Sequence, residues 1–508
     1  MSQTSPSARG SSSSEGAEMG GDAMARAGAQ VPDVAGEPLA TDICVIGAGV
    51  GGLAVASLAA AFGRPVVLVE KQRMGGNGLH AGCVPNRALI AAARRAHAMR
   101  TATPFGIASV DPQIDHRSLL AHMRGVVSTL APNASLERMM GLGVRVILGA
   151  GRFLDKRTLL AGDYRITARR FVIATGSAPT VPPIEGLEGC PYYTEDTIGD
   201  LDRKVASLVV IGASAAGLEL AQAFLRLGAR VTVLEEARAL SREDPEAAAA
   251  VLAALRADGI EIREGTKVER VEKMAGFVRV HTSAPHGYET FDGSHLVIAI
   301  GRTPNLDDLN LAAAGIKQGP SGIAVNRGLR TSNGRVYAIG DVNGSAPSAH
   351  GAAYQAEVVL KRALFWMPSR MDKTILPSVV MTEPELAHVG LTEEEARAAG
   401  HKVRVLRWPF SEVDRAQIER ETAGHAKVVV AASGRVLGAT IVGSRASELI
   451  EVWSLAVAER LNIRALARHV VAAPTFAEVS KRAAVRHFAA LPSNGKVRQL
   501  IDLIARLG

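Results

Sequence analysis

Cys83 is the residue of this chain whose side chain is best suited to redox chemistry. It is the only cysteine in the segment GGNGLHAGCVPNRAL, residues 75–89. A thiolate can form a mixed disulfide or be oxidised to a sulfenic acid. The alternative is an unreactive thiol packed in the protein, since burial usually decides cysteine reactivity. Cys44 and Cys190 have no partner at disulfide-framework or metal-ligand spacing, and the sequence predicts no metal site.

A second chemistry, phosphate binding, is predicted by Gly47, Gly49 and Gly52, which have G-x-G-x-x-G spacing between an apolar strand and a helix. In such a unit the first glycine permits a tight turn, the second lets the backbone approach a pyrophosphate, and the third allows close packing of helix on strand. The N-terminus of the helix stabilises the phosphate charge. Glu70 ends the next strand and can bind a ribose hydroxyl. The pattern therefore favours a dinucleotide site over a glycine turn of another α/β fold.

Gly212, Ser214 and Gly217 repeat this pattern in a second unit, with serine in place of the middle glycine. Serine still leaves a small side chain beside a pyrophosphate. Glu235 closes the following strand and favours NADH, because a carboxylate repels the 2'-phosphate of NADPH. Two dinucleotide sites in one chain predict electron transfer between two bound cofactors. Nearby basic residues that weaken the preference for NADH are Arg230, Arg238 and Arg242.

The composition is that of a globular protein with several domains. The chain has 508 residues, of which 47% are hydrophobic. Its 58 basic and 50 acidic residues are interspersed, so no nucleic-acid partner is expected. No apolar run is long enough to span a bilayer. Residues 1–38 are rich in Ser, Gly and Ala, contain no signal peptide and predict a disordered tail, so the expected location is the reducing cytoplasm.

Ordered motifs along the chain resemble those of the class I pyridine nucleotide-disulfide oxidoreductases, among them dihydrolipoamide dehydrogenase, glutathione reductase and mercuric reductase. The resemblance extends from about residue 41 to about residue 490. The stretch REDP, residues 242–245, looks most like mercuric reductases. Besides the two glycine fingerprints, the motifs are VIATGSAP (172–179), AIGRTPNLDDLNLAAAGI (299–316), VYAIGDV (336–342), VVMTEPELAHVGLTEEEA (379–396) and GATIVGSRASELIEVWSLAV (438–457).

The resemblance implies an α/β fold with two Rossmann-like dinucleotide-binding domains, for FAD and NAD(P), and a C-terminal α+β dimerisation domain. A discontinuous FAD-binding domain would span residues 39–186 and 302–370. An NAD(P)H-binding domain, residues 187–301, would be inserted within it. The dimerisation domain would cover residues 371–490, so a homodimer is the expected assembly.

Site residues carry over from the family motifs position by position. Asp341 would bind the ribityl chain of FAD, since a carboxylate accepts hydrogen bonds from hydroxyl groups. Arg87 and Glu219 would pair beside the flavin and favour hydride arrival, the alternative being an ordinary structural ion pair. The residues expected to bind FAD are Gly47, Gly49, Gly52, Glu70, Gly75, Gly76, Gly151, Thr175, Gly176, Gly340, Asp341 and His350. Those expected to bind NAD(P)H are Gly212, Ser214, Gly217, Glu235 and Gly301.

The chain departs from the family where thiol chemistry takes place. The family's redox loop has two cysteines, and here Gly78 stands at the first, substrate-side position while Cys83 keeps the second, flavin-side position. In the C-terminal segment, Ala473 replaces the histidine that protonates the leaving thiol, although Glu478 remains. Dithiol–disulfide exchange needs an attacking thiolate, a resolving thiol and a proton donor, of which two are missing. The candidate catalytic residues are Cys83, Arg87, Glu219 and Glu478.

These features predict an FAD-dependent NAD(P)H oxidoreductase. Hydride would pass from NAD(P)H to FAD and on to a non-disulfide acceptor, such as a quinone, oxygen or another small oxidant. One alternative is mercuric reductase-like or dihydrolipoamide dehydrogenase-like activity through Cys83, although the C-terminal cysteine pair of mercuric reductases is absent. Another is a non-catalytic sensor or partner module that binds FAD and NADH. The intact fingerprints and the expected Arg87–Glu219 pair argue against that module.

Residues 491–508 predict an amphipathic C-terminal helix. Such a helix could make weak contact with a membrane surface or dock on a partner. Packing on its own dimer is the favoured interpretation. The apolar face consists of Val497, Leu500, Ile501, Ile504 and Leu507.

Overall fold

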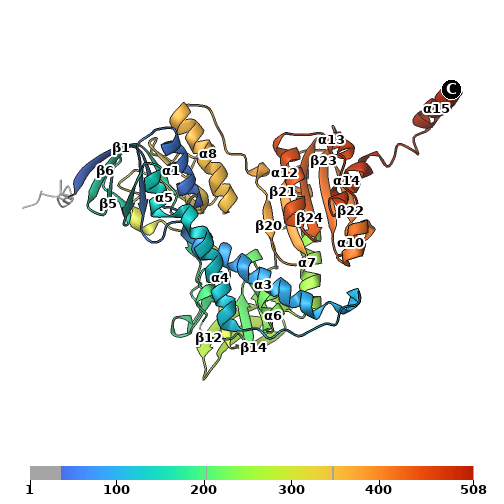
Figure 1. Cartoon of the computed structure of the whole chain (residues 1–508), viewed down its shortest axis with the longest axis horizontal. Coiled ribbons are helices and arrows are strands. Elements are labelled where there is room, and N and C mark those ends of the chain that lie inside the picture. The colour runs from blue at the N-terminus through green and yellow to red at the C-terminus, as the bar shows by residue number, and fades with distance from the viewer. Residues whose placement is uncertain (1–35, 202, 346–347, 507–508) are drawn as a thin grey trace, which may run out of the picture. The chain divides into compact units, whose positions relative to one another are not determined.

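The computed structural model describes residues 36–201, 203–345 and 348–506. The described elements form three regions, each built on its own main sheet (Figure 1). A mainly parallel sheet, in which β4, β5 and β6 pair antiparallel, a parallel sheet and a separate antiparallel sheet, each with helices packed on it, make up the α/β fold expected from the sequence. The expected tail, residues 1–38, lies outside the described residues as far as residue 35. Its last two residues, Glu37 and Pro38, belong to the first strand. Among the described helices, none is long and apolar enough to cross a bilayer.

The N-terminal region is built on a sheet with the strand order β3-β2-β1-β6-β5-β4, and β19 pairs with β6. β1 and β2 are parallel and are connected by α1, which packs beside α8 on the sheet. Cys44 lies in β1 and is fully buried, as expected of a small core residue. The elements are β1 (Glu37–Ile46), α1 (Val50–Ala61), β2 (Val66–Glu70), β3 (Val144–Leu148), β4 (Gly151–Phe153), β5 (Thr158–Ala161), β6 (Tyr164–Ile173), β17 (Gln318–Gly319), β18 (Gly322–Ile323), β19 (Val336–Ala338) and α8 (Ala349–Phe365).

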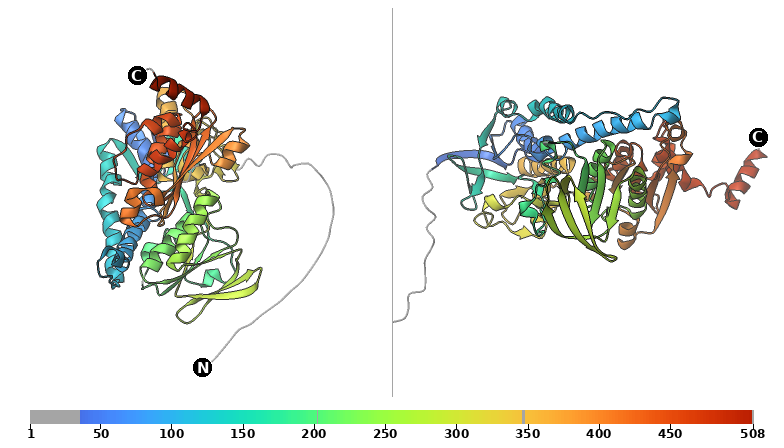
Figure 2. Two further views of the ribbon diagram at one scale, coloured as in Figure 1. Left: turned by 90° about the vertical axis from the view of Figure 1, so that its right-hand side faces the viewer. Right: turned by 90° about the horizontal axis from the view of Figure 1, so that it is seen from below.

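A set of helices between β2 and β3 carries the segment that contains Cys83. α3 and α4 lie side by side (Figure 2). α3 also packs on α6 (Ala215–Arg226) of the next region through one apolar cluster that includes Leu89 and Ala93. The N-terminal end of α3 is thereby fixed relative to a helix more than a hundred residues away in sequence. The helices are α2 (Gly76–His80), α3 (Val84–Arg100), α4 (His116–Leu130) and α5 (Leu136–Gly141).

The middle region has a parallel sheet with the order β11-β10-β9-β15-β8. Its two central strands, β9 and β15, are nearly continuous apolar runs, because both faces of the sheet are covered there. Val210 of β9 faces α6 and α7, whereas the adjacent Val209 faces the antiparallel sheet β12-β13-β14. The elements are β8 (Tyr193–Thr194), β9 (Ser207–Ile211), β10 (Arg230–Glu235), α7 (Pro245–Asp258), β11 (Glu261–Glu264), β12 (Lys267–Lys273), β13 (Val278–Ala284), β14 (Gly287–Gly293) and β15 (His295–Ile298).

Two short strands connect the N-terminal and middle regions. β7 (Ser177–Pro179) follows β6, and β16 (Arg302–Pro304) follows the middle region. They pair antiparallel, with Arg302 opposite Pro179 and Pro304 opposite Ser177. The chain therefore leaves and re-enters the N-terminal region through one two-stranded connection.

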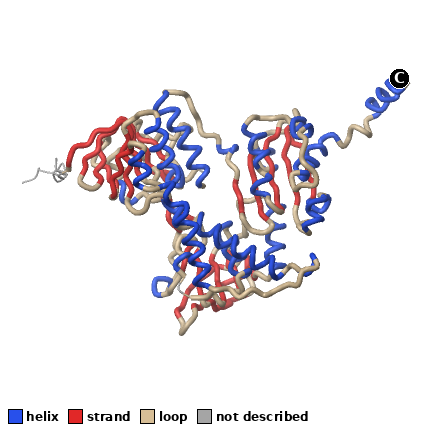
Figure 3. Tube along the Cα trace, in the orientation of Figure 1, coloured by secondary structure: helices blue, strands red, loops and turns tan. Residues whose placement is uncertain are grey.

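The C-terminal region is an antiparallel sheet with the order β20-β21-β24-β23-β22, with helices packed on it (Figure 3). Trp453 of α12 is fully buried in its core, where its indole N–H donates to Ser480 Oγ at 2.9 Å. The elements are β20 (Ser378–Val380), β21 (Glu385–Gly390), α9 (Glu393–Ala398), β22 (Val403–Pro409), α10 (Asp414–Glu419), β23 (His425–Ala431), β24 (Val436–Gly443), α11 (Ala446–Leu449), α12 (Glu451–Ala458), α13 (Ile463–Arg468) and α14 (Glu478–Val485).

The last helix, α15 (Gly495–Ala505), lies within the residues expected to form an amphipathic helix. Leu500, Ile501 and Ile504 are more than half exposed, and none of the helix's residues is buried. It extends away from the C-terminal sheet in Figure 1. Leu507 of the expected apolar face lies outside the described residues.

A buried ion pair joins the middle and C-terminal regions. Lys427 of β23 donates to Asp244 at 2.7 Å, and the exposed fractions of the two side chains are 7% and 3%. Asp244 also caps α7 by accepting from the backbone N–H groups of Glu246 and Ala247. Burial opposes ionisation of Asp244, but the hydrogen bond and charge of Lys427 outweigh it and lower the pKa of the carboxyl. The REDP stretch therefore anchors α7 to the C-terminal sheet.

We expect Lys427→Met to lower the thermal midpoint at pH 7, because loss of one partner of a buried ion pair costs about 3–5 kcal/mol. Ionised Asp244 contributes stability above its unfolded pKa, and this contribution is lost as the pH falls through the lower folded pKa. The difference from wild type should therefore shrink in acid. Lys361→Met, at the exposed pair with Glu357, is the control and should change the midpoint little. Equal midpoints for Lys427→Met and wild type would contradict the prediction.

Candidate functional site

Both glycine fingerprints open onto one cleft of about 2940 Å³. Most of the predicted site residues line it, although they come from the N-terminal and middle regions. Of the predicted residues, Gly52, Gly75, Gly217 and Glu478 are not part of the lining. The lining residues among those predicted are Gly47, Gly49, Glu70, Gly76, Cys83, Arg87, Gly151, Thr175, Gly176, Gly212, Ser214, Glu219, Glu235, Gly301, Gly340, Asp341 and His350.

The first fingerprint has the geometry that close backbone packing requires. Gly47 has φ +104°, and a Cβ there would overlap the carbonyl group of Ala174. A Cβ on Gly52 would overlap the carbonyl oxygen of Gly47, so the third glycine acts through packing and not through the cleft lining. A Cβ on Gly49 would meet no atom within 4 Å. Gly49 thus presents open backbone at the N-terminus of α1, as a pyrophosphate site requires.

The acids that follow the two fingerprints are held in the same way. Glu70 accepts from the backbone N–H groups of Ala48 at 2.6 Å and Gln72 at 2.7 Å. Glu235 accepts from those of Ala213 at 2.8 Å and Ala237 at 2.9 Å. Each carboxylate is thus fixed at the end of its strand and also lines the cleft, with lone pairs left for ribose hydroxyls.

Ser214 has a structural role that its small size alone does not predict. Its hydroxyl donates to the carbonyl oxygen of Ala299 at 2.7 Å and accepts from the backbone N–H of Gly217 at 3.3 Å, which caps α6. Of the three arginines expected near this site, Arg238 and Arg242 line the cleft and Arg230 does not.

Cys83 is the N-cap residue of α3, and its side chain is exposed. All three cysteines belong to the described part of the chain, and the other two are buried, which raises the pKa of their thiols. A Cβ added at Gly78 would make an ordinary contact with Val50 Cγ2 at 3.6 Å. The fold therefore leaves room for a side chain at position 78.

Arg87 and Glu219 form the ion pair that the family resemblance implies. The guanidinium of Arg87 on α3 donates to Glu219 Oε2 on α6. The backbone N–H of Met381, which follows β20, donates to Glu219 Oε1 at 2.7 Å. The Glu219 side chain is 7% exposed and the Arg87 side chain 38% exposed. The carboxylate is therefore buried behind the guanidinium, which lines the cleft.

Two family models match the chain. The model described as "Pyridine nucleotide-disulphide oxidoreductase" matches residues 41–356, and that of the corresponding dimerisation domain matches residues 376–484. The chain belongs to the pyridine nucleotide-disulphide oxidoreductases. Proteins of this family bind FAD and NAD(P)H, and the chain is an FAD-containing, NAD(P)H-dependent oxidoreductase, as predicted. The dimerisation domain indicates a homodimer.

Individual relatives of this oxidoreductase agree with the family match. Mercuric reductase of Lysinibacillus sphaericus is 34% identical over 447 residues, which cover 87% of this chain and 82% of that protein. Dihydrolipoyl dehydrogenase of Geobacillus stearothermophilus is 32% identical over 452 residues, which cover 87% and 95%. The solved Cu(II) complex of HOCl-induced flavoprotein disulfide reductase RclA from Escherichia coli has a TM-score of 0.77 at 26% identity, covering 87% of this chain and 98% of that one.

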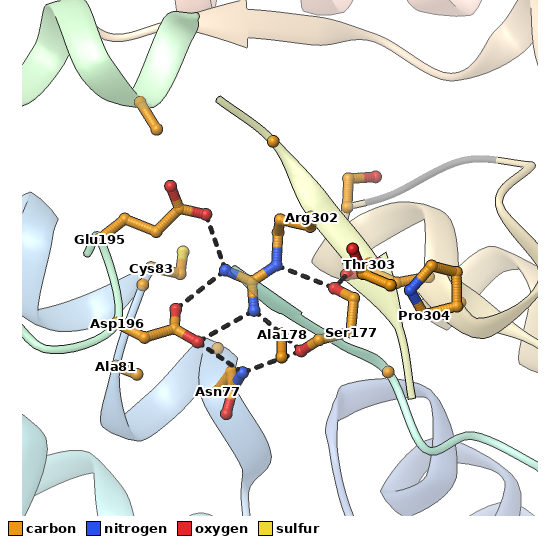
Figure 4. A pocket seen from close by; sticks show the side chains of 18 of the residues that line it. Asn77, Ala81, Cys83, Ser177, Ala178, Glu195, Asp196, Arg302, Thr303 and Pro304 are labelled. Atoms are coloured by element: carbon orange, nitrogen blue, oxygen red, sulfur yellow. Dashed lines mark hydrogen bonds and ion pairs between the residues drawn. The ribbon is translucent and has the colours of Figure 1, made fainter. Parts of the chain in front are cut away.

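A polar network beside Cys83 contains Arg302, Glu195 and Asp196, which are not among the predicted site residues (Figure 4). Arg302 donates to Ser177 Oγ at 2.8 Å, to Glu195 at 2.7 Å and to Asp196 at 2.9 Å. Arg302 follows Gly301 in the motif AIGRTPN, so that motif points to it, whereas no spacing pattern indicates the two acids. Burial of Glu195 raises the pKa of its carboxyl, although Arg302 acts in the opposite direction.

The network reaches the predicted ribityl-binding acid. Ser177 Oγ lies 2.6 Å from Asp341 Oδ2 and 2.8 Å from Arg302 Nε. Arginine can only donate, so the Ser177 hydroxyl accepts from Arg302 and gives its own proton to Asp341. This orientation leaves the second carboxylate oxygen of Asp341 free of protein partners that the structure describes.

Other predicted residues of the flavin side have structural partners. Thr175 Oγ1 donates to Asn305 O at 2.9 Å. His350 lies in the first turn of α8, where its Nε2 donates to Pro377 O at 2.8 Å. Gly75 approaches the first fingerprint, and its N–H donates to Ala48 O at 2.8 Å.

Glu478 lies in the C-terminal region, outside the cleft lining. It accepts from Thr475 N at 3.3 Å, just before α14, and from Arg482 at 2.8 Å, an ordinary i,i+4 pair on α14. Ala473 is exposed in the preceding segment. Within one described chain, therefore, Glu478 is not brought to Cys83.

We expect Gly49→Ala to weaken FAD binding by about tenfold or more, a loss of about 1.4 kcal/mol, because the methyl group would enter the space predicted for the pyrophosphate. The FAD-free variant should unfold at the wild-type temperature, since the added Cβ meets no protein atom within 4 Å. Gly334→Ala, at another open glycine outside the cleft lining, is the matched control. Equal FAD dissociation constants for Gly49→Ala and wild type, measured by equilibrium dialysis, would contradict the predicted site.

Proposed function

We propose that this enzyme passes electrons from NAD(P)H through FAD to a non-disulfide acceptor, such as a quinone, oxygen or another small oxidant. The observation that carries the proposal is the composition of the cleft. It keeps two dinucleotide fingerprints and the Arg87–Glu219 pair, but has a single thiol, Cys83, with Gly78 at the first cysteine position of the family loop. The hydride-accepting half of the family chemistry is thus provided for, and the disulfide-exchanging half is not.

The residues present fit the two nucleotides. Open backbone at Gly49 and the N-terminus of α1 would hold the pyrophosphate of FAD, and Glu70 would hold a ribose. Asp341 would accept from the ribityl hydroxyls with the carboxylate oxygen that Ser177 leaves free. Gly212, the N-terminus of α6 and Glu235 would hold the nicotinamide nucleotide in the same manner. Bound FAD supplies the two-electron carrier between nucleotide and acceptor.

Arg87 has the electrostatic role in this proposal. Glu219 fixes the guanidinium from behind, with its other carboxylate oxygen bound to the N–H of Met381. A fixed cation in a partly enclosed cleft stabilises negative charge that develops nearby, at no cost of reorganisation. Arg87 would therefore favour reduction of the bound cofactor, and it requires no sulfur to do so.

Disulfide exchange has little support at this cleft. The exposed thiol of Cys83 has no resolving cysteine, because the other two thiols are buried. The family histidine is replaced by alanine at 473, and a methyl group transfers no proton. Activity toward Hg(II) or lipoamide through Cys83 is a second candidate function. It is supported by the exposure of that thiol and by the similarity to a mercuric reductase and a dihydrolipoyl dehydrogenase.

The proposal includes NADH as the preferred nucleotide, because Glu235 lies where a 2'-phosphate would be repelled. Arg238 and Arg242 line the same part of the cleft and reduce this preference. A cytoplasmic location is proposed because the cysteines are unpaired. Weak membrane contact through the exposed apolar side chains of α15 is compatible with a quinone acceptor.

The proposal predicts that NADH bleaches the flavin absorbance of the FAD-loaded protein in an anaerobic titration. One equivalent of NADH per FAD should suffice, and NADPH should act more slowly. A screen of quinones, oxygen, oxidised lipoamide and Hg(II) would then identify the acceptor. Absence of bleaching by either nucleotide would reject the proposed hydride transfer. Turnover with lipoamide that exceeds turnover with every other acceptor would reject the non-disulfide acceptor.

Two substitutions distinguish the contribution of the Arg87 charge from that of the Cys83 thiol. Arg87→Met is expected to slow flavin reduction by NADH at least about tenfold, equivalent to about 1.4 kcal/mol, because the fixed cation is removed. Cys83→Ser should leave both flavin reduction and acceptor turnover near wild type. Stopped-flow absorbance under anaerobic conditions measures the first step, and steady-state NADH oxidation measures the second. Loss of acceptor turnover in Cys83→Ser would assign the electron path to the sulfur.

A further inference from the structure

The wall of the cleft at segment 77–83 is the place where the family has its two cysteines, and here Asp196 lies beside both ends of it. Asn77 Nδ2 donates to Asp196 Oδ2 at 2.8 Å. At the other end, a Cβ added to Gly82 would lie only 3.1 Å from Asp196 Oδ1. Asp196 therefore bonds to the residue before position 78 and lies close to the residue before Cys83. These are the chain neighbours of the two family cysteine positions.

Arg302 fixes the carboxylate of Asp196 with a bidentate pair of hydrogen bonds. Nη1 donates to Oδ1 at 2.9 Å, and Nη2 donates to Oδ2 at 3.0 Å. The pair is only partly exposed, with 22% of the Arg302 side chain and 14% of the Asp196 side chain accessible. A fork of this geometry restricts both distance and orientation, as a single ion contact does not.

Every N–H group of Arg302 has a partner. Besides the two bonds to Asp196, Nε donates to Ser177 Oγ at 2.8 Å, Nη2 to Ser177 O at 2.9 Å and Nη1 to Glu195 at 2.7 Å. A guanidinium has five N–H donors, so none is left over and the side chain has one fully satisfied orientation. Asn77 Nδ2 also reaches Ser177 O at 3.1 Å, which ties segment 77–83 to the β7–β16 connection (Figure 4).

We propose that the Arg302–Asp196 pair is a non-covalent brace that holds segment 77–83, and with it Cys83, where a two-cysteine loop would be held by its disulfide. Arg302 and Asp196 are positioning residues, because Arg302 fixes Asp196, which in turn bonds to Asn77 and lies close to Gly82. The inference rests on the proposed function, in which no disulfide forms at this loop during turnover. The brace keeps the cleft wall ordered although one of the two sulfurs is missing.

The test compares amide hydrogen exchange in the FAD-loaded, full-length protein. Arg302→Lys keeps the positive charge but loses the fork, so amides of residues 77–83 should exchange roughly tenfold faster or more, and Cys83 should be alkylated faster by iodoacetamide. The matched control is Arg279→Lys. Arg279 also makes a bidentate pair, through Nε and Nη2, with Asp292, at 2.8 Å for both bonds, between β13 and β14. It should leave exchange at residues 77–83 unchanged.

Asp196→Asn is the second variant, for the case that Arg302→Lys does not fold. It keeps the shape of the side chain but places an N–H₂ group toward Arg302 or Asn77, so it should also raise exchange at residues 77–83. Wild-type exchange in a folded Arg302→Lys or Asp196→Asn protein would overturn the proposal. Faster exchange throughout the chain, and not only in this segment, would also overturn it.

A disulfide should rescue the braced segment. Gly78→Cys combined with Arg302→Lys introduces a thiol at a position with room for it. Oxidised glutathione can accept the two electrons and two protons that the two thiols release when the bond forms, and it becomes two reduced glutathione molecules. Slow exchange at residues 77–83 should return on oxidation and be lost again with dithiothreitol. A disulfide proved by mass spectrometry that leaves exchange fast would contradict the brace.

Flavin reduction by NADH, followed on the same samples, separates this inference from the proposed function. Wild-type protein that is not reduced by NADH would reject the proposed function, while the exchange data would still decide whether the brace holds the segment. Wild-type protein that is reduced, combined with unchanged exchange in the brace variants, would reject the brace alone.

Discussion

The close approach of a helix to the strand before it is the constraint on which both predicted nucleotide sites depend. At Gly52 and at Gly217 a Cβ would overlap the carbonyl oxygen of the preceding turn glycine, and the turn glycines Gly47 and Gly212 have φ +104° and +103°. No other residue type satisfies both demands without moving the helix. Because the same solution occurs twice, both helix N-termini and both terminal acids open onto one cleft.

The cleft also depends on contacts that join regions far apart in sequence. α3 and α6 share an apolar cluster that extends to Val380, Leu386 and Val442 of the C-terminal sheet. Hydrogen bonds and ion pairs fix the orientation of the packed elements. Glu219 binds Arg87 of α3 and the backbone that follows β20, and a buried Lys427–Asp244 pair anchors α7. Apolar burial stabilises the contact between regions, whereas the ion pairs and hydrogen bonds set the positions of individual groups in the cleft.

The chemistry of this cleft is asymmetric. The groups proposed to bind two dinucleotides and to stabilise charge on a reduced cofactor line the cleft. Of the groups that disulfide exchange needs, only one exposed thiol, Cys83, is left. Ala473 stands at the position of the proton donor. All N–H groups of Arg302, beside the segment that contains Cys83, are hydrogen-bonded. This part of the cleft wall therefore has a fixed polar network although it contains one cysteine and not two. The proposed acceptors, which take electrons without forming a bond to sulfur, are compatible with such a cleft.

The sequence by itself determined the features that local chain geometry imposes. Glycine spacing, apolar strands and terminal acids such as Glu70 and Glu235 specify each nucleotide unit within a short stretch, because turn and helix geometry act between near neighbours. The Arg87–Glu219 pair spans 132 residues and was accessible only through resemblance to the family. Tertiary structure alone decided that the Ser214 hydroxyl caps α6 and that Arg302 joins Glu195 and Asp196, which are 107 and 106 residues away. A side chain's hydrogen-bond partner depends on which segments the fold brings together, and no local pattern encodes that choice.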